Sequence, residues 1–309
     1  MVRRTFIQNT SLSIAGIAVS KFHFNKMRKF RVSLNPGAIG VKTDAKQLLS
    51  HAIYYGFEAI VPNASELAIM DKSVMHEYLS KMEKENITFG SLGLPVDFRK
   101  DSDTFKKGLI ELTDMCSSLR DAGVKRMSTW IMPTHNSLTY LENMKQQSSR
   151  LKMIANILGH FGIRFGLEYV GPKTLLARDK YPFVSSLKEC KELVSAIDES
   201  NVGFVLDSFH WYCAEEGVSD LLTLDNKDII TVDLNDAVSG RDIYSQLDWE
   251  RMLPGDSGVI DLKGFVNALK TLGYDGPVRA EPFNKVLNEM NDNDALKRTY
   301  NAMKKAVDL

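Results

Sequence analysis

The nine residues VGFVLDSFH (202–210) form an almost unbroken apolar run that leads into an acid and a histidine. Such a run is typical of a parallel strand that is buried on both faces. Seven further runs share this short, apolar, β-branched character: KFRVSLN (29–35), FEAIVP (57–62), ITFGSLGLP (87–95), VKRMSTWIMP (124–133), IRFGLEYVGP (163–172), IITVDLNDA (229–237) and PVRAEPF (277–283). The sequence therefore predicts eight strands.

Amphipathic helices are expected between these strands. Three of them begin with an aspartate cap and stop before a glycine, over 44–55, 101–122 and 261–272. A fourth, over 73–85, carries an apolar stripe, and a tail helix over 289–307 follows the eighth strand. Because each helix returns the chain to the same end of the sheet, the strands pair in parallel. We therefore expect a (β/α)8 TIM barrel.

An open, doubly wound sheet is the competing architecture. It usually carries a glycine-rich phosphate loop after the first strand. The nearest stretch here, NPGAIG (35–40), lacks the G-x-G-x-x-G spacing. The barrel is favoured, and since barrels commonly need about 250 residues around one core, residues 29–309 are predicted to be a single domain.

The charge balance limits the classes of partner. The chain has 39 basic and 39 acidic residues, so no global field draws it to nucleic acid or to an anionic membrane. We expect a small-molecule ligand, no nucleic-acid partner and no stable membrane association. Cys116, Cys190 and Cys213 fit neither a disulfide framework nor a thiolate metal site, and they are expected to be buried.

The first 28 residues differ from the rest. Arg3 and Arg4 precede a mildly apolar stretch of small residues over 11–20, which resembles a twin-arginine export signal. The sequence predicts an N-terminal extension that directs the chain to the periplasm or out of the cell. The alternative is a cytoplasmic chain with a frayed tail, since no A-x-A cleavage site is evident.

Each of the last four predicted strands ends in an acid: Glu168, Asp207, Asp233 and Glu281. Catalytic groups of such barrels lie at the C-terminal ends of the strands. Four converging carboxylates would repel one another, and a divalent cation resolves that conflict. The alternative is that each acid caps the next helix or pairs with an arginine.

Several motifs resemble the xylose-isomerase-like barrels. They are Glu168, the D-x-x-H unit over 207–210, the N-D-A of 235–237, RMLPGDSGVIDL (251–262), GYDGPV (273–278) and Glu281. The family includes sugar isomerases, ketose 3-epimerases, inosose isomerases and dehydratases, and endonuclease IV. The resemblance extends over nearly the whole chain after residue 29, and it is strongest to the 2-keto-myo-inositol isomerase type.

The resemblance implies that Glu168, Asp207 and Glu281 are metal ligands. The fourth family ligand is usually a histidine, and here that position holds Asp233. An all-oxygen site favours Mn²⁺ or Mg²⁺, with Zn²⁺ or Co²⁺ as alternatives. The departure also leaves open a weak ion site.

The resemblance also implies that His210 and Arg251 contact the substrate. For Arg251, a surface ion pair with Asp248 or Asp256 is the alternative. Trp130 and Trp211 follow the fourth and sixth strands, where either would offer a flat wall to a sugar ring or would simply pack. We include both among the predicted substrate-binding residues.

The predicted function is a metal-dependent isomerase or epimerase of a small keto-sugar or keto-cyclitol. Glu168 and Glu281 would serve as base and acid around an enediolate. A lyase or dehydratase using the same site, and a barrel that binds sugar without turnover, stay open. Six histidines and zero net charge argue against a zinc-rich endonuclease. Barrels of this family often pair through their outer helices, so a homo-oligomer is also open.

Overall fold

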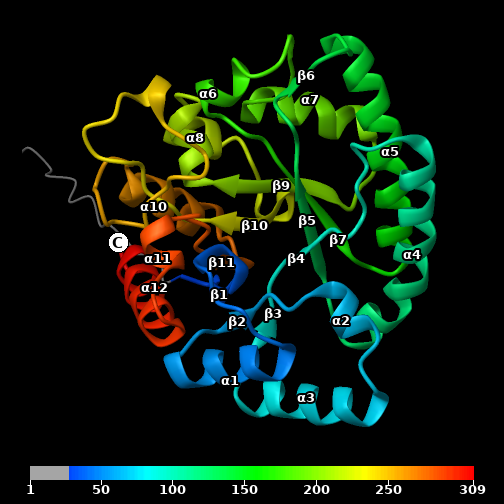
Figure 1. The fold of residues 1–309 in the computed structure, drawn as a ribbon, viewed down its shortest axis with the longest axis vertical. Helices are drawn as coiled ribbons and strands as arrows, with labels where there is room; N and C mark the ends of the chain where they lie inside the picture. Colours follow the sequence, from blue (N-terminus) through cyan, green and yellow to red (C-terminus); the bar gives the residue numbers. More distant parts are fainter. Residues whose placement is uncertain (1–27) are drawn as a thin grey trace, which may run out of the picture.

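The computed structural model describes residues 28–309, which form a nearly closed parallel barrel surrounded by helices (Figure 1). Its nine strands follow the order β3-β2-β1-β11-β10-β9-β7-β5-β4. They are β1 (Arg31–Leu34), β2 (Ala59–Ile60), β3 (Thr88–Phe89), β4 (Leu92–Gly93), β5 (Arg126–Trp130), β7 (Arg164–Glu168), β9 (Val202–Asp207), β10 (Ile229–Asp233) and β11 (Pro277–Arg279). The barrel fold predicted from the sequence is confirmed.

All eight predicted runs contain a strand, and the third run contains two. β3 pairs with β2, and β4 pairs with β5, so one short segment provides both edges of the sheet. The break lies at Gly90 and Ser91. A Cβ at Gly90 would lie 2.6 Å from the Ser33 hydroxyl, so this crossing needs a residue without a side chain.

The helices cover the outside of the ring, as Figure 1 shows for α1, α3, α4 and α5. They are α1 (Ala45–Tyr55), α2 (Ala64–Ala68), α3 (Lys72–Lys84), α4 (Ser102–Asp121), α5 (Tyr140–His160), α6 (Lys173–Leu176), α7 (Leu187–Ile197), α8 (Ser208–Cys213), α9 (Val218–Leu221), α10 (Leu262–Leu272), α11 (Lys285–Asn288) and α12 (Asp292–Val307). Asp44, Asp101 and Asp261 cap α1, α4 and α10 as predicted.

The apolar core fills the barrel and the space between strands and helices, and the three cysteines lie buried and unpaired within it. Two further short strands, β6 (Thr134–His135) and β8 (Tyr181–Pro182), form a separate antiparallel pair in the loops after β5 and β7. Among residues 28–309, no helix is long and apolar enough to cross a membrane. The predicted export signal lies outside the described residues, apart from Arg28.

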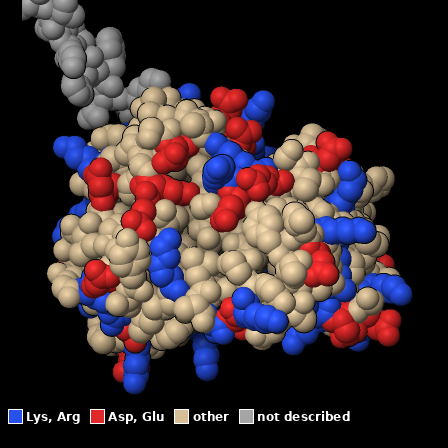
Figure 2. Space-filling view, turned by 90° about the horizontal axis from the view of Figure 1, so that it is seen from above, with Lys and Arg blue, Asp and Glu red and all other residues tan. Residues whose placement is uncertain are grey.

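Figure 2 shows acidic and basic side chains intermixed over one face of the molecule. No large patch of a single sign is visible on that face, in keeping with the zero net charge of the chain.

Candidate active site

The four predicted acids meet at the C-terminal end of the barrel. Glu168 ends β7, Asp207 ends β9, Asp233 ends β10, and Glu281 lies just beyond β11. The sheet register places Asp207 directly beside Asp233. One carboxylate oxygen from each of the four acids lies within 4.8 Å of those of the others. The structure therefore brings together all four residues of the predicted metal cluster.

A cavity of about 590 Å³ opens at this end of the barrel. Its wall includes Glu168, Glu281, His210, Arg251 and Arg279. Aspartates 207 and 233 are fully buried behind that wall. A cavity of this size suits a small metabolite.

Burial raises the pKa of Glu168 well above its usual range, and the charges of Glu281, Asp233 and Asp207 raise it further. Its Oε1 is buried and has no hydrogen-bond partner among the described residues. Burial likewise raises the pKa of Glu281 to about 7, against the opposing charge of Arg279. These two carboxyls are the least satisfied acids of the cluster, and groups tuned in this way are frequent at catalytic sites.

Asp207 accepts more hydrogen bonds than either glutamate of the cluster. It caps α8 by accepting from the Phe209 N–H at 2.7 Å, and it also accepts from the Asn235 side-chain amide and from Arg251 Nη1 at 2.7 Å. Burial still raises its pKa to about 6, although Arg251 opposes the shift. The N-D-A segment of the sequence therefore supports the site, because its asparagine fixes this carboxylate.

Arg251 is buried at 2% exposure, so the ion pair with Asp248 that the sequence left open does form, but not at the surface. It pairs with Asp207 and, at 2.6 Å, with Asp248, whereas Asp256 pairs with Arg298. Its guanidinium also lies near the rings of two phenylalanines, 209 and 283.

The loop that carries Arg251 is tied down by Asp236. The Asp236 carboxylate accepts from the N–H groups of residues 237, 257, 258 and 260. Asp236 also pairs with Met252 through reciprocal backbone hydrogen bonds. These bonds hold residues 252–260 against Asp236, next to the Arg251 that lines the cavity.

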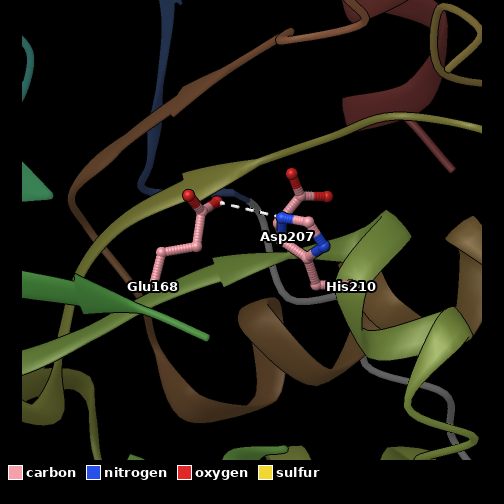
Figure 3. A group of neighbouring side chains, drawn as sticks. All are labelled: Glu168, Asp207 and His210. Atoms are coloured by element: carbon pink, nitrogen blue, oxygen red, sulfur yellow. Dashed lines mark ion pairs between the residues drawn. The ribbon is translucent and has the colours of Figure 1, made fainter. Parts of the chain in front are cut away.

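His210 projects from α8 toward Glu168, as Figure 3 shows, with 3.8 Å between its Nε2 and Glu168 Oε1. Burial and then the charge of Arg251 lower the pKa of His210 to about 3, so the imidazole is neutral. The Gly171 N–H contacts Nδ1 at 3.4 Å and Arg251 Nη2 contacts Nε2 at 3.3 Å, so a hydrogen-bond donor faces each ring nitrogen. A Cβ at Gly171 would lie 2.4 Å from the His210 carbonyl, so only glycine permits this approach.

The two tryptophans predicted to bind substrate lie in different surroundings. Trp130 lines the cavity and is 41% exposed, with the Arg99 guanidinium 3.9 Å from its ring centre. Trp211 is buried, packs edge-on against Phe265 and donates to the Gly217 carbonyl. It is not among the residues that line the cavity. The structure thus brings Trp130 to the site and leaves Trp211 in the core.

Asp233 pairs with an arginine, the alternative that the sequence left open, but its partner Arg279 was not among the predicted site residues. Arg279 Nε donates to its Oδ1 at 2.6 Å, and Arg279 Nη2 donates to its Oδ2 at 3.0 Å. Arg279 ends β11, and Glu281 lies two residues beyond it, with 3.4 Å between Arg279 Nη2 and Glu281 Oε1. The register sets Arg279 beside Asp233. The position of Arg279 two residues before Glu281 was the feature of the sequence that could have indicated its place in the site.

The residues present fit a divalent cation. Four carboxylates within 4.8 Å face only two buried guanidiniums, and one buried oxygen, Glu168 Oε1, lacks a partner. A second group of possible ligands joins His210 to Glu168 and Asp207. Buried oxygen ligands with unbalanced negative charge are what such an ion binds.

Comparison with known proteins identifies the family to which this site belongs. The model of the xylose isomerase-like TIM barrel family matches residues 49–306. The chain belongs to that family. The inosose isomerase of Bacillus velezensis is 27% identical over 184 residues, 60% of this chain and 62% of that relative, so less than two thirds of the relative is matched.

Solved structures share this fold. A xylose isomerase domain protein from Alicyclobacillus acidocaldarius has a TM-score of 0.79 and 26% identity, covering 90% of this chain and 98% of that one. The IOLI protein, solved with a bound zinc atom, has a TM-score of 0.74, 21% identity and the same coverage. At that identity the second likeness concerns the fold alone.

Proposed function

We propose that this protein is a divalent-metal-dependent isomerase or epimerase of a small keto-sugar or keto-cyclitol. The observation that carries the proposal is the Glu168 carboxyl, which is buried, has one unpartnered oxygen and lies beside Glu281 at the cavity wall. Two carboxyls with raised pKa values, close together and facing one substrate, are suited to remove a proton and return it.

Each residue then has a distinct task. Glu168, in its ionised form, takes the proton from the carbon beside the substrate carbonyl. Glu281, in its protonated form and with a pKa of about 7, donates its own proton to the opposite face or to the neighbouring carbon. The neutral His210 hydrogen-bonds a substrate oxygen, and Arg251 supplies a fixed positive charge toward the enediolate. A hydrophobic face of the ring would rest on Trp130.

The cluster residues Glu168, Asp207, Asp233 and Glu281 supply the candidate ligands for the ion. When bound, the ion draws charge from the carbonyl and the adjacent hydroxyl and so acidifies the shared C–H. Oxygen ligands favour Mn²⁺ or Mg²⁺, and His210, as a further ligand, would make Zn²⁺ or Co²⁺ suitable.

The charge of the cavity favours a substrate without phosphate. The arginines of the wall are already paired: Arg251 with two aspartates, Arg279 with Asp233, and Arg178 with Asp179. Among the described residues of the wall, no basic side chain is left to neutralise a phosphate dianion. A neutral polyol ketone fits better, and inosose, the ketone named in the relative's activity, is such a compound.

The test is proton exchange in D₂O. The protein with Mn²⁺ is incubated with 2-keto-myo-inositol and with a panel of ketohexoses, and ¹H NMR follows loss of the signal from the carbon next to the carbonyl. We expect exchange that EDTA stops, that Mn²⁺ restores and that Glu168→Gln abolishes without unfolding the protein. Release of water or of another leaving group would identify a lyase. Absence of exchange throughout the panel, with Mn²⁺ bound, would leave only a binding protein.

A further inference from the structure

The two buried arginines of the site are arranged alike. Each lines the cavity and covers an aspartate behind it, Arg251 in front of Asp207 and Arg279 in front of Asp233. An ion entering the cluster must therefore compete with a guanidinium at either aspartate. The two arginines differ in the hydrogen bonds and ion pairs that each would keep if its aspartate bound an ion instead.

Arg251 has other partners. Its Nη2 donates to Asp248 at 2.6 Å, its Nε donates to the Asp248 carbonyl at 2.8 Å, and its Nη1 also contacts the Glu281 carbonyl at 3.2 Å. The guanidinium is further stabilised by the rings of Phe209 and Phe283. If Asp207 turned to an ion, Arg251 would remain paired and hydrogen-bonded.

Arg279 has almost nothing else. Within residues 28–309, the only acidic contact of Arg279 besides its two bonds to Asp233 is Glu281 Oε1 at 3.4 Å. If the Asp233 carboxylate rotated to bind an ion, the buried Arg279 guanidinium would lie beside a divalent cation and would keep only its weak contact with Glu281. A buried charge that loses its partner is strongly destabilising, so the Asp233–Arg279 pair resists opening.

Arg279 also has a free donor. Its Nη1 donates to no described residue, and the side chain forms part of the cavity wall. The side-on pairing through Nε and Nη2 fixes the plane of the guanidinium and therefore the direction of Nη1. This is the geometry of a preorganised hydrogen-bond donor.

From these contacts we infer that Asp233 is a positioning residue for Arg279 rather than an ion ligand, and that Arg279 Nη1 binds a substrate oxygen. The inference rests on the proposed function. Glu168, Asp207 and Glu281 then hold the ion, and the Asp233–Arg279 pair occupies the fourth side of the cluster. The Arg279 guanidinium thus occupies the position from which Asp233 would otherwise reach the metal.

Paired substitutions that conserve charge separate a ligand from a positioning residue. Asp233→Asn/Arg279→Gln and Asp207→Asn/Arg251→Gln each remove one negative and one positive charge from neighbouring strand ends. Mn²⁺ affinity of the full chain is measured by the electron paramagnetic resonance signal of the free ion, and circular dichroism checks the fold. Supporting residues typically change metal affinity by about 10–100-fold when lost, so we expect about tenfold weakening in the first variant and more than about a hundredfold in the second.

Equal, large losses of Mn²⁺ affinity in both variants would make Asp233 a ligand and overturn the inference, while the proposed function would stand. A wild-type chain that binds no Mn²⁺ would overturn the ion-dependent function and this division of the site together. For the substrate contact, Arg279→Lys keeps the charge beside Asp233 and removes the fork. We expect it to raise KM for the exchanging ketone at least tenfold with Mn²⁺ affinity unchanged; an unchanged KM would refute the contact.

Discussion

Neutralising one acid of the cluster should stabilise the ion-free protein. In Glu281→Gln the shape of the side chain is kept and its charge is lost. Burial raises the pKa of Glu281 to about 7 from an ordinary value of 4.5. The unfolded chain therefore releases this proton near pH 4.5 and the folded chain only near pH 7. Ionisation costs the folded state stability as pH rises through that window, and the cost is complete above it.

The magnitude follows from the two pKa values. One pKa unit corresponds to about 1.4 kcal/mol, so the ionised Glu281 carboxylate costs roughly 3 kcal/mol of folding free energy above pH 7. In a chain of this length one kcal/mol moves Tm by about 2 °C, which predicts a Tm for Glu281→Gln roughly 6 °C above wild type at pH 8. Glu281 also raises the pKa of Glu168, so its removal eases that ionisation too.

The assay is thermal unfolding in EDTA from pH 4 to pH 8.5. The difference in Tm between the variant and wild type should be near zero at pH 4 and reach its maximum above pH 7. Glu58→Gln is the matched control, because hydrogen bonds from Arg28 and Val32 outweigh burial and lower the pKa of Glu58. That control should lose stability at neutral pH and approach wild type as pH falls. A Glu281→Gln difference that is independent of pH, or negative at pH 8, would refute the reasoning.

Three further predictions address the rest of the site. Trp211→Ala should lower the free energy of unfolding by about 3–5 kcal/mol, because its ring packs on Phe265. Trp130→Ala should raise KM and leave the free energy of unfolding within about 1 kcal/mol of wild type. Equal losses of stability in the two variants would contradict the assignment of Trp130 to the site and Trp211 to the core. Asp236→Ala removes four backbone hydrogen bonds, so urea unfolding should show a loss of about 3 kcal/mol or more, and trypsin should cut the loop over 238–258 faster. Gly171→Ala should abolish proton exchange by displacing α8, and an active variant with an unshifted helix in a crystal structure would count against the steric argument.

The sequence was sufficient for features that depend on local patterns. Buried strands read as apolar runs, and aspartate caps with terminal glycines mark helix ends, so barrel topology and the limits of α1, α4 and α10 could be predicted. The convergence of Glu168 with Asp207 was also predictable, because parallel strands deliver their C-terminal residues to one end. These inferences need only the order of elements along the chain.

Side-chain direction and pairing required the three-dimensional structure. The sequence predicted both tryptophans to follow strands. In the structure Trp130 ends β5, whereas Trp211 lies on α8, which begins at Ser208, and its indole packs on Phe265 instead of lining the cavity. Arg251 pairs with a residue 44 positions earlier, and no local pattern marks such a contact. Periodicity assigns a residue to an element and cannot state which of several charged neighbours its side chain will meet.

The four acids of the site are unequally paired, and the two least paired ones lie at the cavity wall. Two guanidiniums compensate two of the four charges, and the hydrogen bonds go mainly to Asp207 and Asp233. The glutamates, which lie at the cavity wall, retain raised pKa values and incomplete bonding. A fold that only needed to tolerate these carboxylates would satisfy the buried Glu168 oxygen first, since an unpartnered buried charge is the costliest arrangement. The barrel satisfies the two aspartates instead and leaves the two glutamates incompletely bonded at the cavity wall, which supports the proton-transfer roles that we propose for them.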